Sequence, residues 1–468
     1  MENNDKKSGF YLLSDNTDAF IARFALATMA EKTLDIQYYI IHNDASGQYL
    51  YYAILSAANR GVRVRILVDD INLSGRDHRL KMFSQHENIE IRIFNPLVNR
   101  DWFRNLELIV NLNRAGRRMH NKAFIADNSV AIIGGRNIGD EYFDARTNLN
   151  FVDLDMLSVG PIVKDISNSF VDYWDSHWAT PIEKLSKGKV IRKQLISIQH
   201  KLKDKWLRIK NTAYFKSIQN ADLTQDIIQK KIPFIWADAQ LFYDCPNKIS
   251  SQGTEPIVHF GPQVMSYFEQ AKNELLLASP YFVPGINNTL WFSDKSKQGV
   301  RIKVLTNSLS STDVIAVHAG YQKYRNQLLE HNIALFELKP TANISLFRKN
   351  KLSRHYSHTS LHAKYMIIDQ QYVFIGSANL DPRSNRLNTE IGIMVNSTAL
   401  AAQASEIFKR TTSAKNCYRL KLTGKDRKLA WLTKEEGQEK TVFTEPGVGI
   451  LKRLAVFLIS LLPIENLL

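Results

Sequence analysis

The chain carries one polar pattern twice, and this duplication constrains its fold more than any other feature. The stretch "MHNKAFIADNSVAIIGGRN" covers residues 119–137, and "LHAKYMIIDQQYVFIGSAN" covers residues 361–379. Matched residues stand 242 positions apart: His120 and His362, Lys122 and Lys364, Asp127 and Asp369, Gly134 and Gly376, Asn137 and Asn379. A repeat with so long a period predicts two copies of one folded unit within the 468 residues.

Apolar segments around the repeat indicate the class of that unit. "GVRVRILVDD" (61–70) and "GVRIKVLTNS" (299–308) are expected to be equivalent strands, and "IEIRIF" (89–94) corresponds to "IALFEL" (333–338). Helical segments separate these strands, which predicts an α/β fold with a largely parallel sheet in each half. We expect a first half at residues 1–180, a basic helical connector at 181–235, a second half at 236–425 and an amphipathic, apolar tail at 426–468.

Charge and cysteine content narrow the partners and the chemistry. The net charge of +15 and the pI of about 9.5 favour a polyanion, either a nucleic acid or an anionic membrane surface. The two cysteines, Cys245 and Cys417, define neither a disulfide framework nor a zinc site. No run of about 20 apolar residues occurs, so we expect no segment that spans a bilayer.

In each copy of the repeat the histidine and the lysine are two residues apart. Alternate residues of a strand face the same side, so each histidine should lie beside its lysine. A metal site is disfavoured, because lysine repels a cation and no cysteine or acidic cluster accompanies the histidines. Asp127 and Asp369 fall in expected hairpin turns, off the face of the lysines, and are predicted to be structural.

Two histidines and two lysines together suit the transfer of a phosphodiester. One imidazole would attack phosphorus and form a phosphohistidine, while the other protonates the departing alkoxide and then activates the acceptor. The lysines would supply positive charge, and Asn137 and Asn379 would donate hydrogen bonds to the phosphate oxygens. A carboxylate should orient each histidine. Glu390 is the candidate on one side, and on the other the spacing does not separate Asp153 from Asp155, of which Asp155 is our catalytic candidate.

The two copies of HxK(x)4D(x)6G[GS]xN resemble the HKD motifs of the phospholipase D superfamily. "GGRNIGDEYFDA", "SPYFVP", "GSANLDPRSNRLNTEIG" and the final "LLPIENLL" extend the resemblance to bacterial cardiolipin synthases of the C type. The resemblance implies two α/β/α sandwich halves that are related by a pseudo-twofold axis and share one active site. It also implies that His120 is the nucleophile and His362 the general acid and base. It implies no cofactor for the chemistry, although a divalent cation could have an accessory role.

Other residues are expected around the bound substrate. Gly135 and Ser377 occupy the same place in the two copies, and the hydroxyl of Ser377 could touch a phosphate oxygen where Gly135 cannot. The site is therefore not expected to be fully symmetric. Tyr39 and Tyr281 end matched strands, where they either flank the pocket or pack in the core.

The implied reaction is transfer of a phosphatidyl group to an alcohol such as phosphatidylglycerol, as in a cardiolipin synthase. The motifs do not separate this reaction from that of a phospholipase D. In that case water accepts the group, and phosphatidylglycerol, phosphatidylethanolamine or phosphatidylcholine yields phosphatidic acid. A nuclease of the same superfamily would use the same chemistry and would also suit a basic chain, whereas an inactive scaffold disagrees with two intact motifs.

Phospholipids and a membrane surface are the expected partners, rather than a nucleic acid. The tail "GILKRLAVFLISLLPIENLL" (449–468) predicts a helix that lies on a bilayer or docks on the body, and the basic loop 346–358 could meet lipid headgroups. Both motifs lie in one chain, so a monomer is expected, and the sequence identifies no helper protein. We expect a peripheral protein at the inner-membrane surface of a bacterium, or a secreted one if a leader has been removed.

Overall fold

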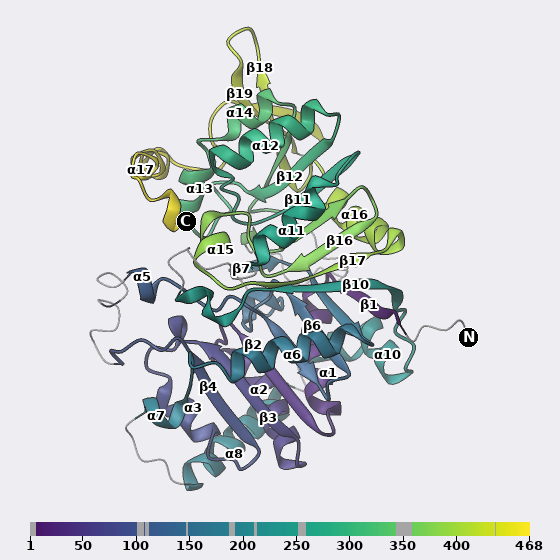
Figure 1. Ribbon diagram of the computed structural model, residues 1–468, viewed down its shortest axis with the longest axis vertical. Helices are drawn as coiled ribbons and strands as arrows, with labels where there is room; N and C mark the ends of the chain where they lie inside the picture. The colour runs from purple at the N-terminus through teal and green to yellow at the C-terminus, as the bar shows by residue number, and fades with distance from the viewer. Residues whose placement is uncertain are drawn as a thin grey trace.

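The computed structural model describes residues 6–100, 107, 112–146, 148–186, 192–209, 213–250, 259–342, 358–435 and 437–468. The second half of the chain lies above the first half in Figure 1. In the first half the paired strands run in the order β9 (Ala179–Pro181), β4 (Ile89–Phe94), β3 (Arg63–Asp69), β2 (Thr33–Tyr38), β5 (Ala123–Ala126), β6 (Val130–Gly134), β8 (Asp155–Val159) and β1 (Ser8–Leu13). Only β2, β3 and β4 are parallel to one another, so the expectation of a largely parallel sheet is wrong. Short turns join β5 to β6, and such turns require antiparallel pairing.

The second half repeats this order and continues the sheet. Its strands run in the order β10 (Ile235–Tyr243), β17 (Ile391–Asn396), β16 (Tyr372–Gly376), β15 (Tyr365–Ile368), β11 (Glu274–Ala278), β12 (Arg301–Asn307), β13 (Ala334–Leu338) and β18 (Cys417–Thr423). Strand β10 also pairs antiparallel with β1, with Gly9 opposite Trp236. The first strand of each half therefore joins the two sheets at their boundary.

Helices cover both sheets, and each half is an α/β/α sandwich. α1 (Asn16–Met29) and α2 (Ala45–Asn59) pack on one face of the first sheet, and α11 (Phe260–Glu269) and α12 (Gly285–Lys297) pack on the second. α6 (Ile162–Trp174) and α16 (Thr398–Thr411) enter one core that is shared by the two halves. Burial of apolar side chains from both halves in this core holds them together as one body.

The expected connector consists of helices that pack on the first half. They are α7 (Ile182–Leu185), α8 (Arg192–Ile209), α9 (Ala213–Gln219) and α10 (Asp222–Ile228). Trp206 of α8 stacks on Phe24 and Tyr52, with ring centroids 4.8 and 5.6 Å apart. The connector is thus anchored to α1 and α2 by aromatic contacts.

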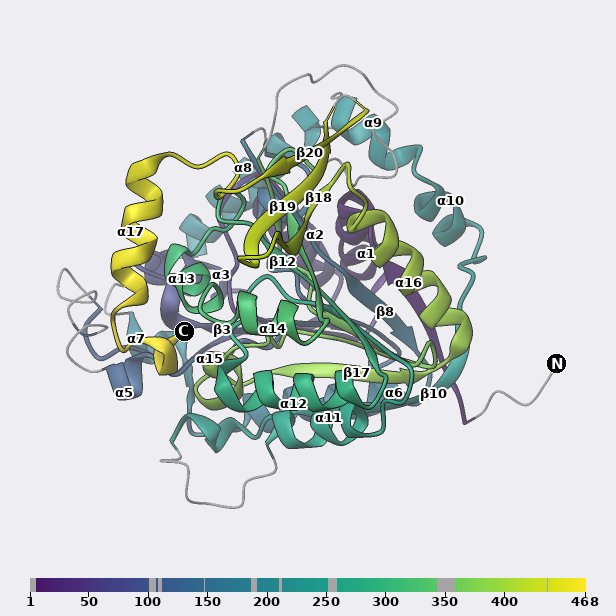
Figure 2. The same ribbon diagram turned by 90° about the horizontal axis from the view of Figure 1, so that it is seen from above.

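The expected apolar tail begins with strands rather than with a helix. β19 (Lys428–Glu435) and β20 (Gln438–Val442) extend the edge of the second sheet beyond β18, so the boundary expected at residue 425 falls in the turn between β18 and β19. The apolar helix α17 (Ile450–Ser460) follows and packs beside α13 (Ile315–Tyr321), as Figures 1 and 2 show. Across the described residues, no helix combines the length and the apolar composition needed to cross a bilayer.

The shorter elements connect this framework. They are α3 (Asp77–Phe83), α5 (Leu112–Ala115), β7 (Leu149–Val152), α14 (Arg325–Glu330), β14 (His358–Leu361), α15 (Pro382–Arg386) and short 3-10 turns at Asp70–Asn72, Asp140–Tyr142, Pro246–Ile249 and Glu465–Leu467. The basic loop 346–358 lies outside the described residues except for His358, which begins β14.

The two motif aspartates each stabilise a tight turn. Asp127 and Asp369 have φ angles of 53° and 51°, and the residues that follow them are also at positive φ, as the two central residues of a type I′ turn require. The Asp127 carboxylate accepts three backbone N–H bonds from residues 31–33 at 2.7–2.9 Å. Asp369 accepts three from residues 272–274 at 2.7–2.8 Å. Each turn is thereby tied to the start of the neighbouring strand, β2 or β11.

Asp127→Ala or Asp369→Ala should each lower the free energy of unfolding by about 2 kcal/mol, because each removes three hydrogen bonds to a carboxylate. The two turns lie in different halves, so the losses should add in the double variant. Urea denaturation measures the change. Asp294→Ala, which removes a carboxylate that is 67% exposed on α12, is the control and should have little effect. Loss of turnover in a variant of unchanged stability would contradict this role.

Candidate active site

The two motif segments meet at the boundary between the halves, where each pairs with backbone from the other half. The backbone N–H of His120 donates to the carbonyl of Thr389 at 2.9 Å. In the equivalent place, β14 pairs in parallel with β7, and the N–H of His362 donates to the carbonyl of Val152 at 2.7 Å. These pairings carry residues 153 and 390 across the boundary toward the opposite histidine.

Each histidine is hydrogen-bonded to a carboxylate from the other half. The Nδ1 atom of His120 lies 2.9 Å from Oε2 of Glu390, and Nδ1 of His362 lies 2.6 Å from Oδ2 of Asp153. Both carboxylates are fully buried, and both histidines are 7% exposed. Neither motif histidine takes its carboxylate partner from its own half, so one centre requires both copies of the repeat.

The partner of His362 is therefore Asp153, which corrects the choice of Asp155. Asp155 lies on β8 and points into the first half, where its Oδ2 is 2.8 Å from Arg23 and 3.1 Å from Arg136. Residues two apart in a strand face the same side, so Asp153 and Asp155 would point the same way if both lay in β8. Asp153 instead lies just before β8, in the link from β7, where the chain is free to turn toward the boundary. Aligning "DLD" (153–155) with "EIG" (390–392) would have matched Asp153 to Glu390, because Gly134 pairs with Asp155 as Gly376 pairs with Gly392.

Gly135 and Ser377 lie against the two carboxylates that orient the histidines. A Cβ on Gly135 would stand 2.2 Å from Oδ1 of Asp153, so only glycine permits the close approach of this short carboxylate. In the second copy the longer Glu390 leaves room for Ser377, whose hydroxyl donates to Oε2 of Glu390 and accepts the N–H of Ile391 at 3.0 Å. The hydroxyl proton of Ser377 is thus directed to Glu390 in the free site, and its expected contact with a phosphate oxygen stays a prediction.

The lysines lie inside the site and hold the backbone of the histidines. Nζ of Lys122 donates to the carbonyl of His120 at 2.6 Å, and Lys364 donates to the carbonyl of His362. Both lysines are 1% exposed. Burial lowers the pKa of Lys122 to about 7 and that of Lys364 to about 8, because a desolvated ammonium is disfavoured. An anion that enters the site would favour the charged form of both.

The free site holds neutral imidazoles against charged carboxylates. Burial lowers the pKa of His120 to about 4 and that of His362 to about 3. Burial alone would raise the pKa of Asp153, but the neighbouring His362 and Lys364 lower it below its usual range. A carboxylate can only accept, so Nδ1 of each ring carries the hydrogen and Nε2 keeps its lone pair. The charge of each lysine also acts on the histidine of the other half, which places all four in one field.

The two motif asparagines differ in their surroundings. Asn137 donates from Nδ2 to the hydroxyl of Tyr142 at 2.9 Å, and its Oδ1 accepts the N–H of Ile40 at 3.3 Å. Asn379 is 9% exposed, and its Oδ1 has no hydrogen-bond partner among the described residues. The phosphate contacts expected of both asparagines stay predictions.

Aromatic rings enclose the histidines. Tyr39 meets His120 edge-on, with ring centroids 4.9 Å apart, and lies 5.5 Å from Nζ of Lys122. Tyr142 and Phe151 each lie 5.1 Å from the ring of His362, and sequence reasoning missed both. Phe151 is two residues before Asp153, and that spacing was the available signal. The hydroxyl of Tyr281 donates to Asp313 at 2.9 Å, and the place of this ring beside the pocket stays a prediction.

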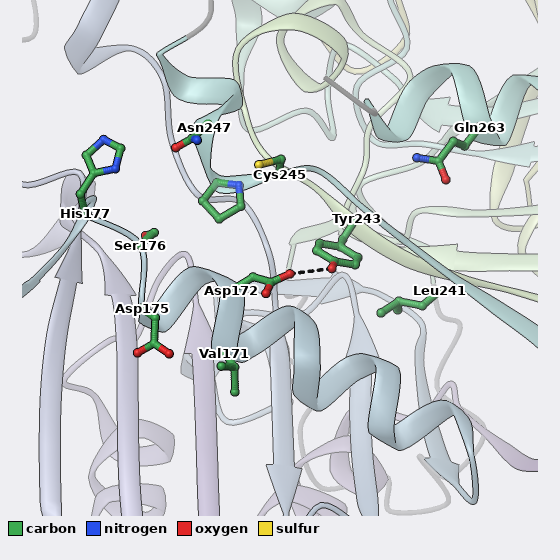
Figure 3. Close-up of a pocket in the computed structure, with 11 residues that line it drawn as sticks. Val171, Asp172, Asp175, Ser176, His177, Leu241, Tyr243, Cys245, Asn247 and Gln263 are labelled. Atoms are coloured by element: carbon green, nitrogen blue, oxygen red, sulfur yellow. Dashed lines mark hydrogen bonds between the residues drawn. The ribbon is translucent and has the colours of Figure 1, made fainter. Parts of the chain in front are cut away.

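Other features of the described chain do not point to a second centre of this chemistry. Among the described residues, no group of three or more His, Cys, Asp or Glu is arranged to hold a metal ion. A cavity of about 710 Å³ lies between the end of α6 and β10, where the Tyr243 hydroxyl donates to Asp172 at 2.7 Å (Figure 3). None of the residues predicted for the site lines this cavity.

The duplicated fold and its crossed centre define a two-motif enzyme of the phospholipase D superfamily. Residues 24–174 and 264–412 match the family model described as cardiolipin synthase, PLD-like domain. Cardiolipin synthase C of Escherichia coli K12 is 37% identical over 462 residues, which cover 98% of this chain and 96% of that protein. The chain therefore belongs to the cardiolipin synthase family of phospholipase D-like proteins.

More distant relatives agree with this placement. An uncharacterized protein of Helicobacter pylori J99 is 34% identical over 86% of this chain and 78% of its own length. Cardiolipin synthase A of Pseudomonas entomophila L48 is 25% identical over 87% of this chain and 68% of its own. The crystal structure of phosphatidylserine synthase from Haemophilus influenzae Rd KW20 superimposes with a TM-score of 0.62 at 12% identity, covering 99% of this chain and 98% of that one. At this identity the likeness shows the shared fold.

Proposed function

We propose that the protein transfers a phosphatidyl group from one phospholipid to the hydroxyl of another through a phosphohistidine on His120. The observation that carries this proposal is the crossed pairing of each histidine with a carboxylate from the opposite half. That pairing gives the centre two oriented imidazoles, one for each side of a phosphorus atom.

In the first step, Nε2 of His120 attacks the phosphorus of the donor lipid. The bond from phosphorus to the departing alcohol oxygen breaks, and protonated His362 gives its proton to that oxygen. An anionic phosphodiester favours protonation of His362, because a negative charge nearby stabilises the imidazolium, and Asp153 supports it from Nδ1. Lys122 and Lys364 balance the charge that develops on the phosphate oxygens.

In the second step, neutral His362 takes a proton from the acceptor hydroxyl. The acceptor oxygen attacks phosphorus, and the bond from phosphorus to Nε2 of His120 breaks, which frees His120 and leaves His362 protonated, as it was at the start of the first step. An acceptor such as phosphatidylglycerol gives cardiolipin, whereas water gives phosphatidic acid. The rings of Tyr39, Tyr142 and Phe151 around the histidines limit the access of water and favour the alcohol.

Product analysis tests this function. The purified protein is incubated with phosphatidylglycerol and phosphatidylethanolamine in mixed vesicles, and the lipids are separated and identified by mass spectrometry. Cardiolipin as the main new lipid is the expected result. Phosphatidic acid without cardiolipin would instead identify a hydrolase, and cleavage of plasmid DNA without either lipid would identify a nuclease.

We further propose that α17 places the enzyme on the membrane surface. One face of this helix and its following turn exposes apolar side chains, with exposed fractions from 50% to 84% for Ile450, Leu451, Leu454, Phe457, Leu458, Leu461 and Leu462. Only Val456 of α17 is buried, against Leu309 and Ala319. An exposed stripe of this kind fits the interface of a bilayer, and the net charge of +15 favours anionic lipids.

Leu454→Glu combined with Phe457→Glu should reduce binding to phosphatidylglycerol vesicles at least 10-fold, since both charges would have to enter the apolar interface. Co-sedimentation measures the binding. Ile228→Glu, which alters a side chain that is 68% exposed on α10, is the matched control and should bind like the unaltered protein. Turnover of a soluble short-chain lipid should persist in both proteins. Equal vesicle binding by both proteins would exclude α17 as the anchor.

Removal of divalent cations should leave the chemical step intact, because Lys122 and Lys364 supply the positive charge in the site. With a soluble short-chain phospholipid, EDTA should change the initial rate by less than twofold. The same chelator can weaken turnover on vesicles if a cation assists docking, which the parallel assay measures. A loss of rate on the soluble lipid, restored by a divalent cation, would contradict the proposed mechanism.

A further inference from the structure

The second half contains an apolar cavity beside its motif loop. About 440 Å³ of space lies between α11, α12 and the segment that leads from Asn379 into α15. Most of its wall is apolar or aromatic, including Val264, Met265, Phe268, Phe282, Trp291 and Phe292. This volume and this lining are typical of sites that hold an apolar ligand.

The duplication shows which side chains occupy the corresponding place in the first half. The motif asparagines fix the register of the two loops, and the bonds from Asp127 and Asp369 fix the register of α1 and α11. Five of the matched pairs are Phe20 and Gly261, Arg23 and Val264, Arg136 and Ala378, Tyr142 and Ser384, Phe143 and Asn385. All five second-half residues line the cavity, and each is smaller than its first-half counterpart.

In the first half those larger side chains fill the space. Phe20, Arg23, Arg136, Tyr142 and Phe143 are all exposed by 4% or less. The rings of Phe20 and Phe143 meet at 5.4 Å, and the Arg23 guanidinium lies 5.6 Å from the ring of Phe143. In the second half a Cβ on Gly261 would stand 2.5 Å from Oδ1 of Asn385, so the matched positions are also neighbours there.

We propose that this cavity binds an acyl chain of a phospholipid substrate, an inference that rests on the proposed function. The acyl chains are the apolar part of such a substrate, and the cavity borders the loop that follows β16, next to the second motif. Ile286 lines the cavity and is 54% exposed, and Leu290 on the same helix is 49% exposed. The cavity therefore reaches an apolar part of the surface, where a chain can enter from a lipid layer.

The pocket makes the two sides of the pseudo-symmetric centre different. A lipid whose chain lies between α11 and α12 approaches phosphorus from the side of the second half. The first half, where Phe20 and Phe143 fill the equivalent space, offers no such anchor among its described residues. Substrate orientation would then be set by the unequal filling of two otherwise matched halves.

Filling the cavity tests the inference. Val264→Phe adds a ring to a side chain that is 4% exposed in the cavity wall, and Gly261→Phe restores the first-half residue. Each should lower kcat/KM for dioleoyl phosphatidylglycerol at least 10-fold and that for dihexanoyl phosphatidylglycerol by less than twofold. Ser266→Phe, which adds the same ring to an exposed position of α11, is the matched control and should change neither value.

The outcomes separate this inference from the proposed function. Unchanged long-chain turnover in both filled variants would overturn the pocket and leave the transfer reaction standing, whereas a wild-type protein inactive on both lipids would overturn the reaction. If the filled variants do not fold, photolabelling of the unaltered protein decides. Phosphatidylglycerol with a diazirine at the end of one chain should label peptides of α11 or α12, and labelling confined to other peptides would overturn the pocket.

Discussion

Replacing His120 with alanine should abolish turnover, with a loss of more than about 10⁴-fold in kcat. Nε2 of His120 is the atom proposed to bond to phosphorus, and His362, the proposed acid and base, cannot fill both roles in its absence. His362→Ala should lose as much on natural lipids, because the leaving alkoxide then receives no proton. His120→Asn and His362→Asn should disturb the fold less than the two alanine variants, since an amide can still donate to Glu390 or Asp153.

An activated substrate separates the two roles. A lipid phosphodiester with a p-nitrophenol leaving group needs no general acid in the first step, so His362→Asn should give a burst of about one p-nitrophenolate per enzyme and then stall. His120→Asn should give no burst. Acid-labile label from the lipid should remain on the peptide that contains His120. The opposite pattern would reverse the two roles, and no burst from either variant would contradict a covalent route.

Much of the fold could be predicted because equivalent segments of the two halves show the same apolar pattern twice. Strands such as β4 begin and end where the apolar pattern places them. Each motif lysine does contact the histidine two residues before it, but both pairs lie just before β5 and β15 and not within a strand, so strand alternation is not the reason. The sheet order could not be predicted in the same way, because parallel and antiparallel pairing depend on how distant segments meet. β19 and β20 were missed for a related reason, since an exposed edge hairpin with charged residues has a weak apolar pattern.

The site was predictable as far as the motif itself, and less so for the residues around it. Ser377 could be placed near the centre, but only the structure shows that its hydroxyl is bonded to Glu390. From the sequence, Gly135 could be interpreted only as a position that lacks the hydroxyl of Ser377, whereas the structure shows that it lets Asp153 come close. Both outcomes depend on the length of the facing carboxylate, aspartate in one copy and glutamate in the other, which a pattern along one strand does not contain.

Asp153→Asn and Asp155→Asn are the second pair of substitutions expected to have a large effect. The first should lower turnover, and the second should lower stability. Asp153→Asn keeps the size of the side chain and removes the charge that orients and supports His362, so kcat should fall by about 10³-fold, within the range known for such substitutions. The free energy of unfolding should change little, because the amide oxygen can still accept from Nδ1.

Asp155→Asn should act on stability instead. It leaves Arg23 and Arg136, which are 1% and 0% exposed, without their buried countercharge, and loss of one partner from such a group costs about 3–5 kcal/mol. Protein that remains folded should keep a kcat within a few-fold of the unaltered enzyme. Urea denaturation and turnover on the same samples measure both quantities. An inactive but fully stable Asp155→Asn beside an active Asp153→Asn would restore Asp155 as the partner of His362, because turnover would then not depend on the hydrogen bond between His362 and Asp153.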